Sequence, residues 1–181
     1  LYLYLKISTM EEKSILKPSM NYGAMLGVVL VAFSLLVYLV DMQANKFVGF
    51  LNYALLIGGV FYAQNNFKTT TLGGYISYGK AFGLGVLTVA FASLISTVYF
   101  YVFVTFVDSG VIDIALEQAY IDMAERGMSD EEVEQAMEYT SMFMTPGMMS
   151  VMAFFASGIF GLIISSITSI FVKREDPTQI V

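Results

Sequence analysis

Long apolar runs dominate this chain, and four of them are separated by shorter polar segments. A helix needs roughly 17–25 apolar residues to cross about 30 Å of hydrocarbon. None of the runs has the period-two alternation of barrel strands, and in lipid every backbone polar group needs an internal partner. The pattern therefore predicts four membrane-spanning helices, at about 19–40, 47–62, 78–107 and 146–172.

The residues that flank the runs agree with this division. Pro146 opens the fourth run and suits the first turn of a helix, and Lys173 follows its end. The first run is too long for the apolar part of a cleavable signal peptide, so we expect it to stay in the membrane. The second run is the shortest, and a buried helix of a soluble protein is an alternative for it.

Composition strengthens the membrane interpretation and removes many chemistries. The 181 residues are 57% hydrophobic and 13% charged, with a mean hydropathy of +0.70, and contain no His and no Cys. Thiol nucleophiles, imidazole bases, His/Cys zinc sites and disulfides are therefore excluded. No nucleotide-binding glycine motif occurs, and the basic residues are too scattered for nucleic acid. We expect a non-enzymatic protein with no cofactor; a membrane enzyme using Asp, Ser, Lys or Tyr is the alternative.

The basic residues also predict an orientation, because cytoplasmic loops are enriched in Lys and Arg. Seven of the nine bases lie on one side of a four-span arrangement, and only Lys46 and Arg126 lie on the other. We expect both termini in the cytoplasm of a bacterium and the chain in its inner membrane. Residues 1–18 would then be a cytoplasmic segment, 19–172 the membrane domain and 173–181 a cytoplasmic tail. Met10 is the expected natural start, so residues 1–9 are expected to be non-native.

The loop between the third and fourth spans, residues 108–145, carries most of the negative charge. It holds ten acids and one base, whereas the rest of the chain has eight bases and five acids. Gly127 follows Arg126 as a helix stop, and Ser129 with Glu132 has the spacing of a capping box. Two apolar stripes at helical spacing complete a predicted helical hairpin outside the membrane: Ile112, Leu116, Ala119 and Met123, then Val133, Ala136, Met137, Thr140 and Met144.

The acids of this hairpin have two interpretations. They form either a divalent-cation site or docking face for a basic partner, or a solvated surface that keeps the loop outside. No calcium-loop motif occurs, and acids in the first turn of a helix are favoured by its dipole. The candidate residues for a partner or cation surface are Asp122, Glu125, Asp130, Glu131, Glu134 and Glu138.

Small residues at four-residue spacing predict where the spans approach one another closely. The fourth span has the longest such stripe, and shorter pairs occur in the first and third. They serve either packing within the bundle or association with a second copy or a membrane partner. These helix-packing candidates are Gly23, Gly27, Gly79, Gly83, Ala153, Ser157, Gly161, Ser165 and Ser169.

Three features together resemble a known bacterial family of small four-span membrane proteins, domain of unknown function 4199. They are the stretch from Leu72 to Gly85, the helix start from Met128 to Glu132, and the Gly/Ser-rich last span that ends in a basic tail, from Gly158 to Arg174. The likeness extends from about Lys13 to Glu175. The family has no assigned activity, so the resemblance implies a topology and no site.

The sequence thus predicts an all-α integral membrane four-helix bundle with an extracytoplasmic helical hairpin between the third and fourth spans. The leading functional hypothesis is a non-enzymatic accessory or interaction subunit, with the bilayer and a homo-oligomer or membrane-protein partner as its surroundings. The alternative is a small oligomeric channel or carrier whose acidic outer mouth concentrates cations.

Overall fold

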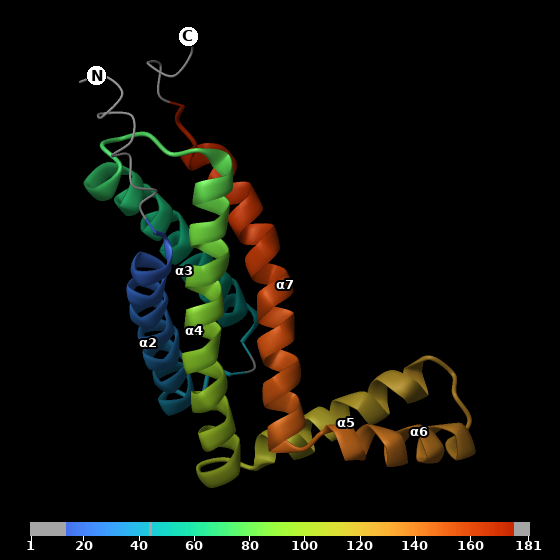
Figure 1. Ribbon diagram of the computed structural model, residues 1–181. Coiled ribbons are helices and arrows are strands. Elements are labelled where there is room, and N and C mark those ends of the chain that lie inside the picture. Colours follow the sequence, from blue (N-terminus) through green and yellow to red (C-terminus); the bar gives the residue numbers. More distant parts are fainter. Residues whose placement is uncertain (1–13, 44, 176–181) are drawn as a thin grey trace, which may run out of the picture.

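A computed structural model describes residues 14–43 and 45–175 of the chain, so the predictions about residues 1–9 and Met10 lie outside the described residues. The described part is helical throughout its regular elements (Figure 1). In chain order these are α2 (Leu16–Leu39), α3 (Lys46–Asn66), the π-helix η1 (Phe67–Thr71), α4 (Tyr78–Phe106), α5 (Gly110–Glu125), α6 (Asp130–Phe143) and α7 (Pro146–Val172).

Four helical segments are long and apolar enough to cross a membrane, namely α2, α3 with η1, α4 and α7. The predicted all-α membrane bundle is therefore confirmed, and the chain is a multi-pass membrane protein. The second span is longer than the predicted 47–62, because the helix continues through η1 to Thr71. The polar residues near the end of this span do not interrupt the helix. Gln64 and the neighbouring Phe67 are buried against the other spans instead of facing outward.

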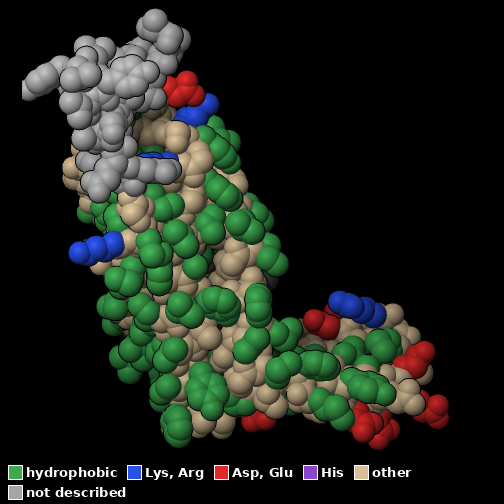
Figure 2. All heavy atoms as spheres, in the orientation of Figure 1, with side chains coloured by type: hydrophobic (Ala, Val, Ile, Leu, Met, Phe, Trp, Pro, Cys, Tyr) green, Lys and Arg blue, Asp and Glu red, His purple; other side chains and the backbone are tan. Residues whose placement is uncertain are grey.

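The outer surface of the bundle is as apolar as its interior. Large side chains such as Phe47, Phe106 and Phe171 are among the most exposed in the described chain. Figure 2 shows hydrophobic side chains over most of the visible face of the bundle. Such a surface is costly in water and suits hydrocarbon, so it agrees with the four spans.

Helix α4 lies at the centre of the packing, with its most extensive contacts to α2 and α7. Glycines make these contacts close: a Cβ added at Gly23 of α2 would lie 2.5 Å from Phe91 Cβ and 2.7 Å from the Thr88 carbonyl oxygen. On the other side of α4, a Cβ at Gly161 of α7 would lie 2.7 Å from Val89 Cγ1. Helix α3 has fewer contacts with its three neighbours and runs at a tilt behind them (Figure 1).

The start of α2 and the end of α7 lie at one end of the bundle, which we call the basic end. There the loop before α4 is tied to the segment after α7, because Ile76 and Arg174 exchange two backbone hydrogen bonds of 2.9 Å. Lys68 Nζ donates to the Val172 carbonyl oxygen at 3.3 Å, where a cation also complements the helix dipole. The Arg174 guanidinium lies 5.5 Å from the centre of the Tyr75 ring.

Helices α5 and α6 form the predicted hairpin at the opposite end, which we call the hairpin end. Gly127 has φ +79° in the turn between them, as expected of a helix stop. The hairpin leaves the bundle at a steep angle to α4 and α7 and extends sideways (Figure 1). The capping box is also present, with Glu132 N–H donating to Ser129 Oγ at 3.4 Å and Ser129 N–H donating to Glu132 Oε2 at 2.9 Å.

Replacing Gly23 with alanine should destabilise the bundle, because the new methyl group would meet backbone and Cβ atoms that cannot move aside cheaply. The expected cost is about 1–3 kcal/mol, typical of overpacking. Gly58→Ala is the matched control, since its Cβ would meet nothing within 4 Å and alanine is the better helix former. Thermal unfolding in mild detergent should show a lower midpoint for G23A alone. Equal midpoints for G23A and the wild type would contradict the close α2–α4 contact.

The capping box predicts a pH-dependent hairpin. The backbone N–H of Ser129, and then its hydroxyl, hold the pKa of Glu132 below its usual range. The charged carboxylate of Glu132 accepts these hydrogen bonds better than the neutral carboxyl does. The stabilisation of the hairpin by the capping box is therefore present above the ordinary pKa range of glutamate, and it is lost as pH falls through the lowered pKa of Glu132.

Ser129→Ala should raise the pKa of Glu132 and destabilise the first turn of α6 by about 1 kcal/mol. Carboxyl NMR titration and amide exchange of the full chain measure both effects. Ser141→Ala, which removes a hydroxyl bonded to the Glu138 carbonyl oxygen later in the same helix, should leave the Glu132 titration unchanged. An identical Glu132 titration in S129A and the wild type would refute the capping role.

Candidate functional site

A layer of polar side chains is buried in the half of the bundle nearer the basic end. Gln64 of α3 is fully buried, and its Nε2 donates to the Ala81 carbonyl oxygen at 3.1 Å and to Ser169 Oγ at 3.0 Å. One side chain thus links α3 to both α4 and α7. Hydrogen bonds of this kind hold membrane helices in a fixed register, because the alternative is an unsatisfied polar group in hydrocarbon.

This polar layer is tightly packed. A Cβ at Gly85 of α4 would lie 2.6 Å from Gln64 Nε2 and 2.7 Å from Ser165 Oγ, so the amide fits only because residue 85 has no side chain. Ser19 of α2 completes the layer, with its Oγ 3.3 Å from the Leu84 carbonyl oxygen. Because glycine and amide fill the space between the helices, the layer acts as a structural contact between all four spans.

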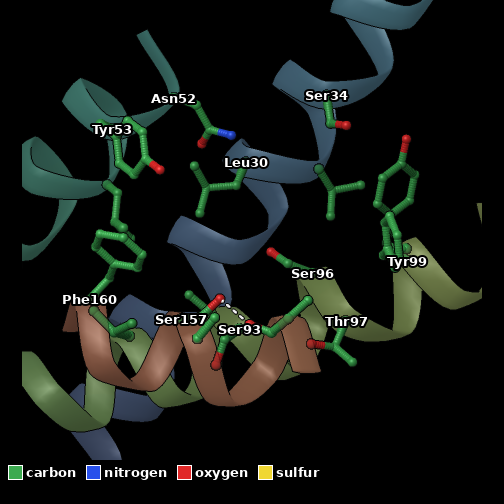
Figure 3. Close-up of a pocket in the computed structure, with 17 residues that line it drawn as sticks. Leu30, Ser34, Asn52, Tyr53, Ser93, Ser96, Thr97, Tyr99, Ser157 and Phe160 are labelled. Atoms are coloured by element: carbon green, nitrogen blue, oxygen red, sulfur yellow. Dashed lines mark hydrogen bonds between the residues drawn. The ribbon is translucent and has the colours of Figure 1, made fainter. Parts of the chain in front are cut away.

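The half nearer the hairpin end is different, because it contains a cavity of about 430 Å³ between the same four spans (Figure 3). Each span contributes polar groups to a wall that is otherwise apolar. No residue of this wall carries a formal charge. The polar residues that line the cavity are Ser34, Asn52, Tyr53, Ser93, Ser96, Thr97, Tyr99 and Ser157.

The hydroxyl groups of this wall fall into two sets. Ser93 Oγ donates to the Ala90 carbonyl oxygen at 2.9 Å and Ser157 Oγ to that of Ala153 at 2.7 Å, so both are satisfied within their own helices. Ser96 Oγ is buried and has no hydrogen-bond partner among the described residues. The side chains of Thr97 and Asn52 likewise have none in the described part of the chain. Figure 3 shows Asn52 of α3 and Ser96 of α4 directed toward the space between the helices, which is open enough that Asn52 is exposed.

The cavity wall offers hydrogen-bonding groups and no formal charge. Ser96 and Thr97 have no base within reach in the structure, and the described residues hold no group of three or more side chains that could ligate a metal ion. An uncharged wall with several hydroxyl and amide groups matches an uncharged ligand that forms hydrogen bonds. The cavity is therefore the candidate ligand site of this chain.

The predicted packing residues divide between close contacts and the cavity. Gly23, Gly27 and Gly161 lie at close helix contacts, and Ser165 and Ser169 lie in the buried polar layer. Ala153 and Ser157, which continue the same α7 stripe, line the cavity instead. The stripe therefore packs closely over only part of its length. A Cβ at Gly83 would meet the Ile15 side chain at 3.0 Å, and one at Gly79 would meet nothing within 4 Å, so the structure brings Gly79 into no helix contact.

The six predicted surface acids all lie on the hairpin and are all exposed: Asp122 and Glu125 on α5, and Asp130, Glu131, Glu134 and Glu138 on α6. Figure 2 shows acidic side chains along the side of the hairpin away from the bundle and at its far tip. The opposite side of α6 packs toward α5 through Val133, which is buried. The acids thus form an open surface, separate from the cavity.

Sequence analysis missed three residues of the polar layer and the cavity wall: Gln64, Ser96 and the exposed Asn52. The available signal was a polar residue within or beside an apolar run, since each lies in a helix long enough to span the membrane. The direction in which each side chain points decides its role, and the helices here are apolar on nearly every face. Periodicity therefore gave no face on which to place these three residues.

The family comparison agrees with the features already described. The family model for a protein of unknown function, DUF4199, matches residues 21–174, which include all four spans and the hairpin. No curated protein and no solved structure matches the chain. The match covers most of the chain and agrees with the resemblance seen in the Leu72–Gly85 stretch. This multi-pass membrane protein belongs to the DUF4199 family of proteins of unknown function.

Proposed function

We propose that this protein is a non-enzymatic interaction subunit of the bacterial inner membrane and that its hairpin is the docking element. The observation that carries the proposal is the sideways projection of α5 and α6, which places an acidic surface beside the bundle instead of above it (Figures 1 and 2). A neighbouring protein in the same membrane can reach such a surface, because the surface lies at the level where the spans end.

The hairpin surface combines two features of protein interfaces. Tyr139 and Phe143 of α6 are 66% and 54% exposed, although aromatic residues of this size are usually buried unless they contact a partner. The acids of α6 are exposed on the same helix and would attract and orient a basic surface. Exposed aromatic residues and acids on one helix favour docking of a partner that carries Lys and Arg. The exposed aromatic residues thus add to the acids that sequence analysis proposed as a docking face.

The alternative, an oligomeric channel or carrier with an acidic mouth, has less support from the geometry. The predicted surface acids lie on the hairpin, and none of them lines the cavity. Toward the basic end, the buried layer around Gln64 and Gly85 fills the space between the helices. The electrostatic field of the hairpin acids would therefore act more on a partner beside the bundle than on an ion that enters the bundle.

The same proposal places the basic end in the cytoplasm. Lys17, Lys68, Lys80, Lys173 and Arg174 all belong to this end, as the positive-inside rule favours. Since the chain has no Cys, single cysteines report on each side without interference. In intact cells, a membrane-impermeant maleimide should label Gln135→Cys on the hairpin, and it should label Lys173→Cys only after permeabilisation. Labelling of K173C alone in intact cells would reverse the orientation.

If the partner docks on the acids of α6, the complex depends on their negative charge and is therefore sensitive to salt. Glu134→Lys with Glu138→Lys should reduce recovery of the partner about tenfold or more in mild-detergent purification from native membranes, because attraction becomes repulsion. Asp41→Lys with Glu175→Lys makes the same change in net charge away from the hairpin and should leave recovery unchanged. Intact-complex mass and identification of the bound proteins provide the measurement.

Two outcomes would overturn the interaction-subunit proposal. One is a clean homo-oligomer that carries no other protein. That result would favour the channel or carrier, which flux assays in proteoliposomes would then test. The other is a partner that both double variants retain equally, which would remove the acidic surface of α6 from the interface.

A further inference from the structure

We propose that the cavity near the hairpin end binds one molecule of an uncharged glycerolipid of the diacylglycerol kind, which enters sideways from the leaflet on the hairpin side, the outer leaflet in the orientation proposed above. The starting observation is Ser96 Oγ, a buried hydroxyl that has no hydrogen-bond partner among the described residues and lies in the cavity wall with Thr97 and the exposed Asn52. A buried polar group without a partner is unfavourable in hydrocarbon, so an occupant that forms a hydrogen bond with Ser96 is favoured.

The wall determines the charge of this occupant. All the residues that line the cavity are uncharged, so a phosphate or ammonium group inside it would lack a counter-charge. Hydroxyl and amide groups of Ser96, Thr97 and Asn52 can donate to ester carbonyl oxygens and can accept from an alcohol. A glycerol bearing two esters and one free hydroxyl offers both kinds of group and has no charge.

The volume and the apolar part of the wall suit the glycerol head and the first part of the acyl chains, whose remainder would lie outside the cavity. A volume of about 430 Å³ corresponds to roughly fourteen waters at about 30 Å³ each, and falls within the range of small-molecule sites. Leu30, Val89 and Phe160 continue the wall with apolar side chains. Polar groups at one part of the wall and apolar groups at the other suit a molecule with a small polar head and acyl tails.

The opening of the cavity points to the leaflet as the source. Tyr53 of α3 and Phe160 of α7 lie on the flank of the bundle, with ring centres 5.9 Å apart and exposures of 50% and 46%. Phe160 is fourteen residues from the start of α7, or about 21 Å along the helix. Ala153 and Ala156 of the same helix also line the cavity and are exposed. A side opening at this depth meets acyl chains, so a lipid can enter without crossing water.

Lipid binding is tested on the full chain in nanodiscs, with a photoreactive diacylglycerol as probe and dioleoylglycerol as competitor. Ala156→Phe should weaken cross-linking, because the ring would occupy part of the cavity at its exposed side. Ala32→Phe, at an exposed position of α2 that does not line the cavity, should cross-link as the wild type does.

The polar contact is tested separately. Ser96→Ala should weaken competition by dioleoylglycerol about fivefold, the value of one hydrogen bond. Ser166→Ala removes a hydroxyl that is already bonded to the Leu162 carbonyl oxygen outside the cavity, and should leave the competition unchanged. The cross-linked peptide should come from α2, α3, α4 or α7 at residues that line the cavity, and thermal unfolding shows whether each variant is folded.

Two further competitors test which part of the lipid the cavity recognises. Glycerol, which has the head without the tails, should not compete, and phosphatidylethanolamine, which has the tails and a charged head, should compete at least tenfold more weakly. Competition by glycerol would mean that the cavity takes a water-soluble solute, and equal competition by phosphatidylethanolamine would mean that charge is not discriminated. Either result, or undiminished cross-linking in folded A156F, would overturn the proposal.

Discussion

Inside a bilayer, apolar side chains gain nothing by leaving lipid for a neighbouring helix, so close backbone contact holds the spans of this chain together. The contact depends on missing side chains. Gly23 and Gly27 bring α2 onto α4, and Gly161 brings α7 onto α4 from the other side. Dispersion contacts and the hydrogen bonds of Gln64 are then available at short range. The position of α4 at the centre of the bundle follows from these three glycines.

The close helix contact extends over only part of the bundle. The place where it stops separates a packed half from a hollow half. Along α7, Gly161, Ser165 and Ser169 are buried against α4 and α3, whereas Ala153 and Ser157 face the cavity. The small residues continue, but α3 is tilted and has fewer contacts with each of its neighbours (Figure 1). A stripe of small side chains that lacks a closely packed neighbour leaves space. The residues that would permit packing thus line a cavity instead.

The sequence predicted the architecture well because lipid restricts the possible backbones so strongly. Runs such as 146–172 must be helices, and Pro146, Gly127 and Ser129 mark local stops and starts whose geometry depends on few neighbours. The interior was harder to predict. Gln64 ends up buried although it begins the most polar part of the second span, and only the packing of four helices determines that direction. Ser96 and Asn52 belong to the cavity for the same reason.

The hairpin and the cavity share the same two helices. Thr97 is nine residues before the end of α4 at Phe106, and Ser157 is eleven residues after the α7 start at Pro146. At 1.5 Å per residue, the cavity wall lies about 14–17 Å along each helix from the point where the hairpin attaches. Helices are stiff over this distance, so a change in the separation of α4 and α7 at the cavity also moves the two attachment points of the hairpin. The ligand and the partner that we propose would therefore act on the same two helices, α4 and α7.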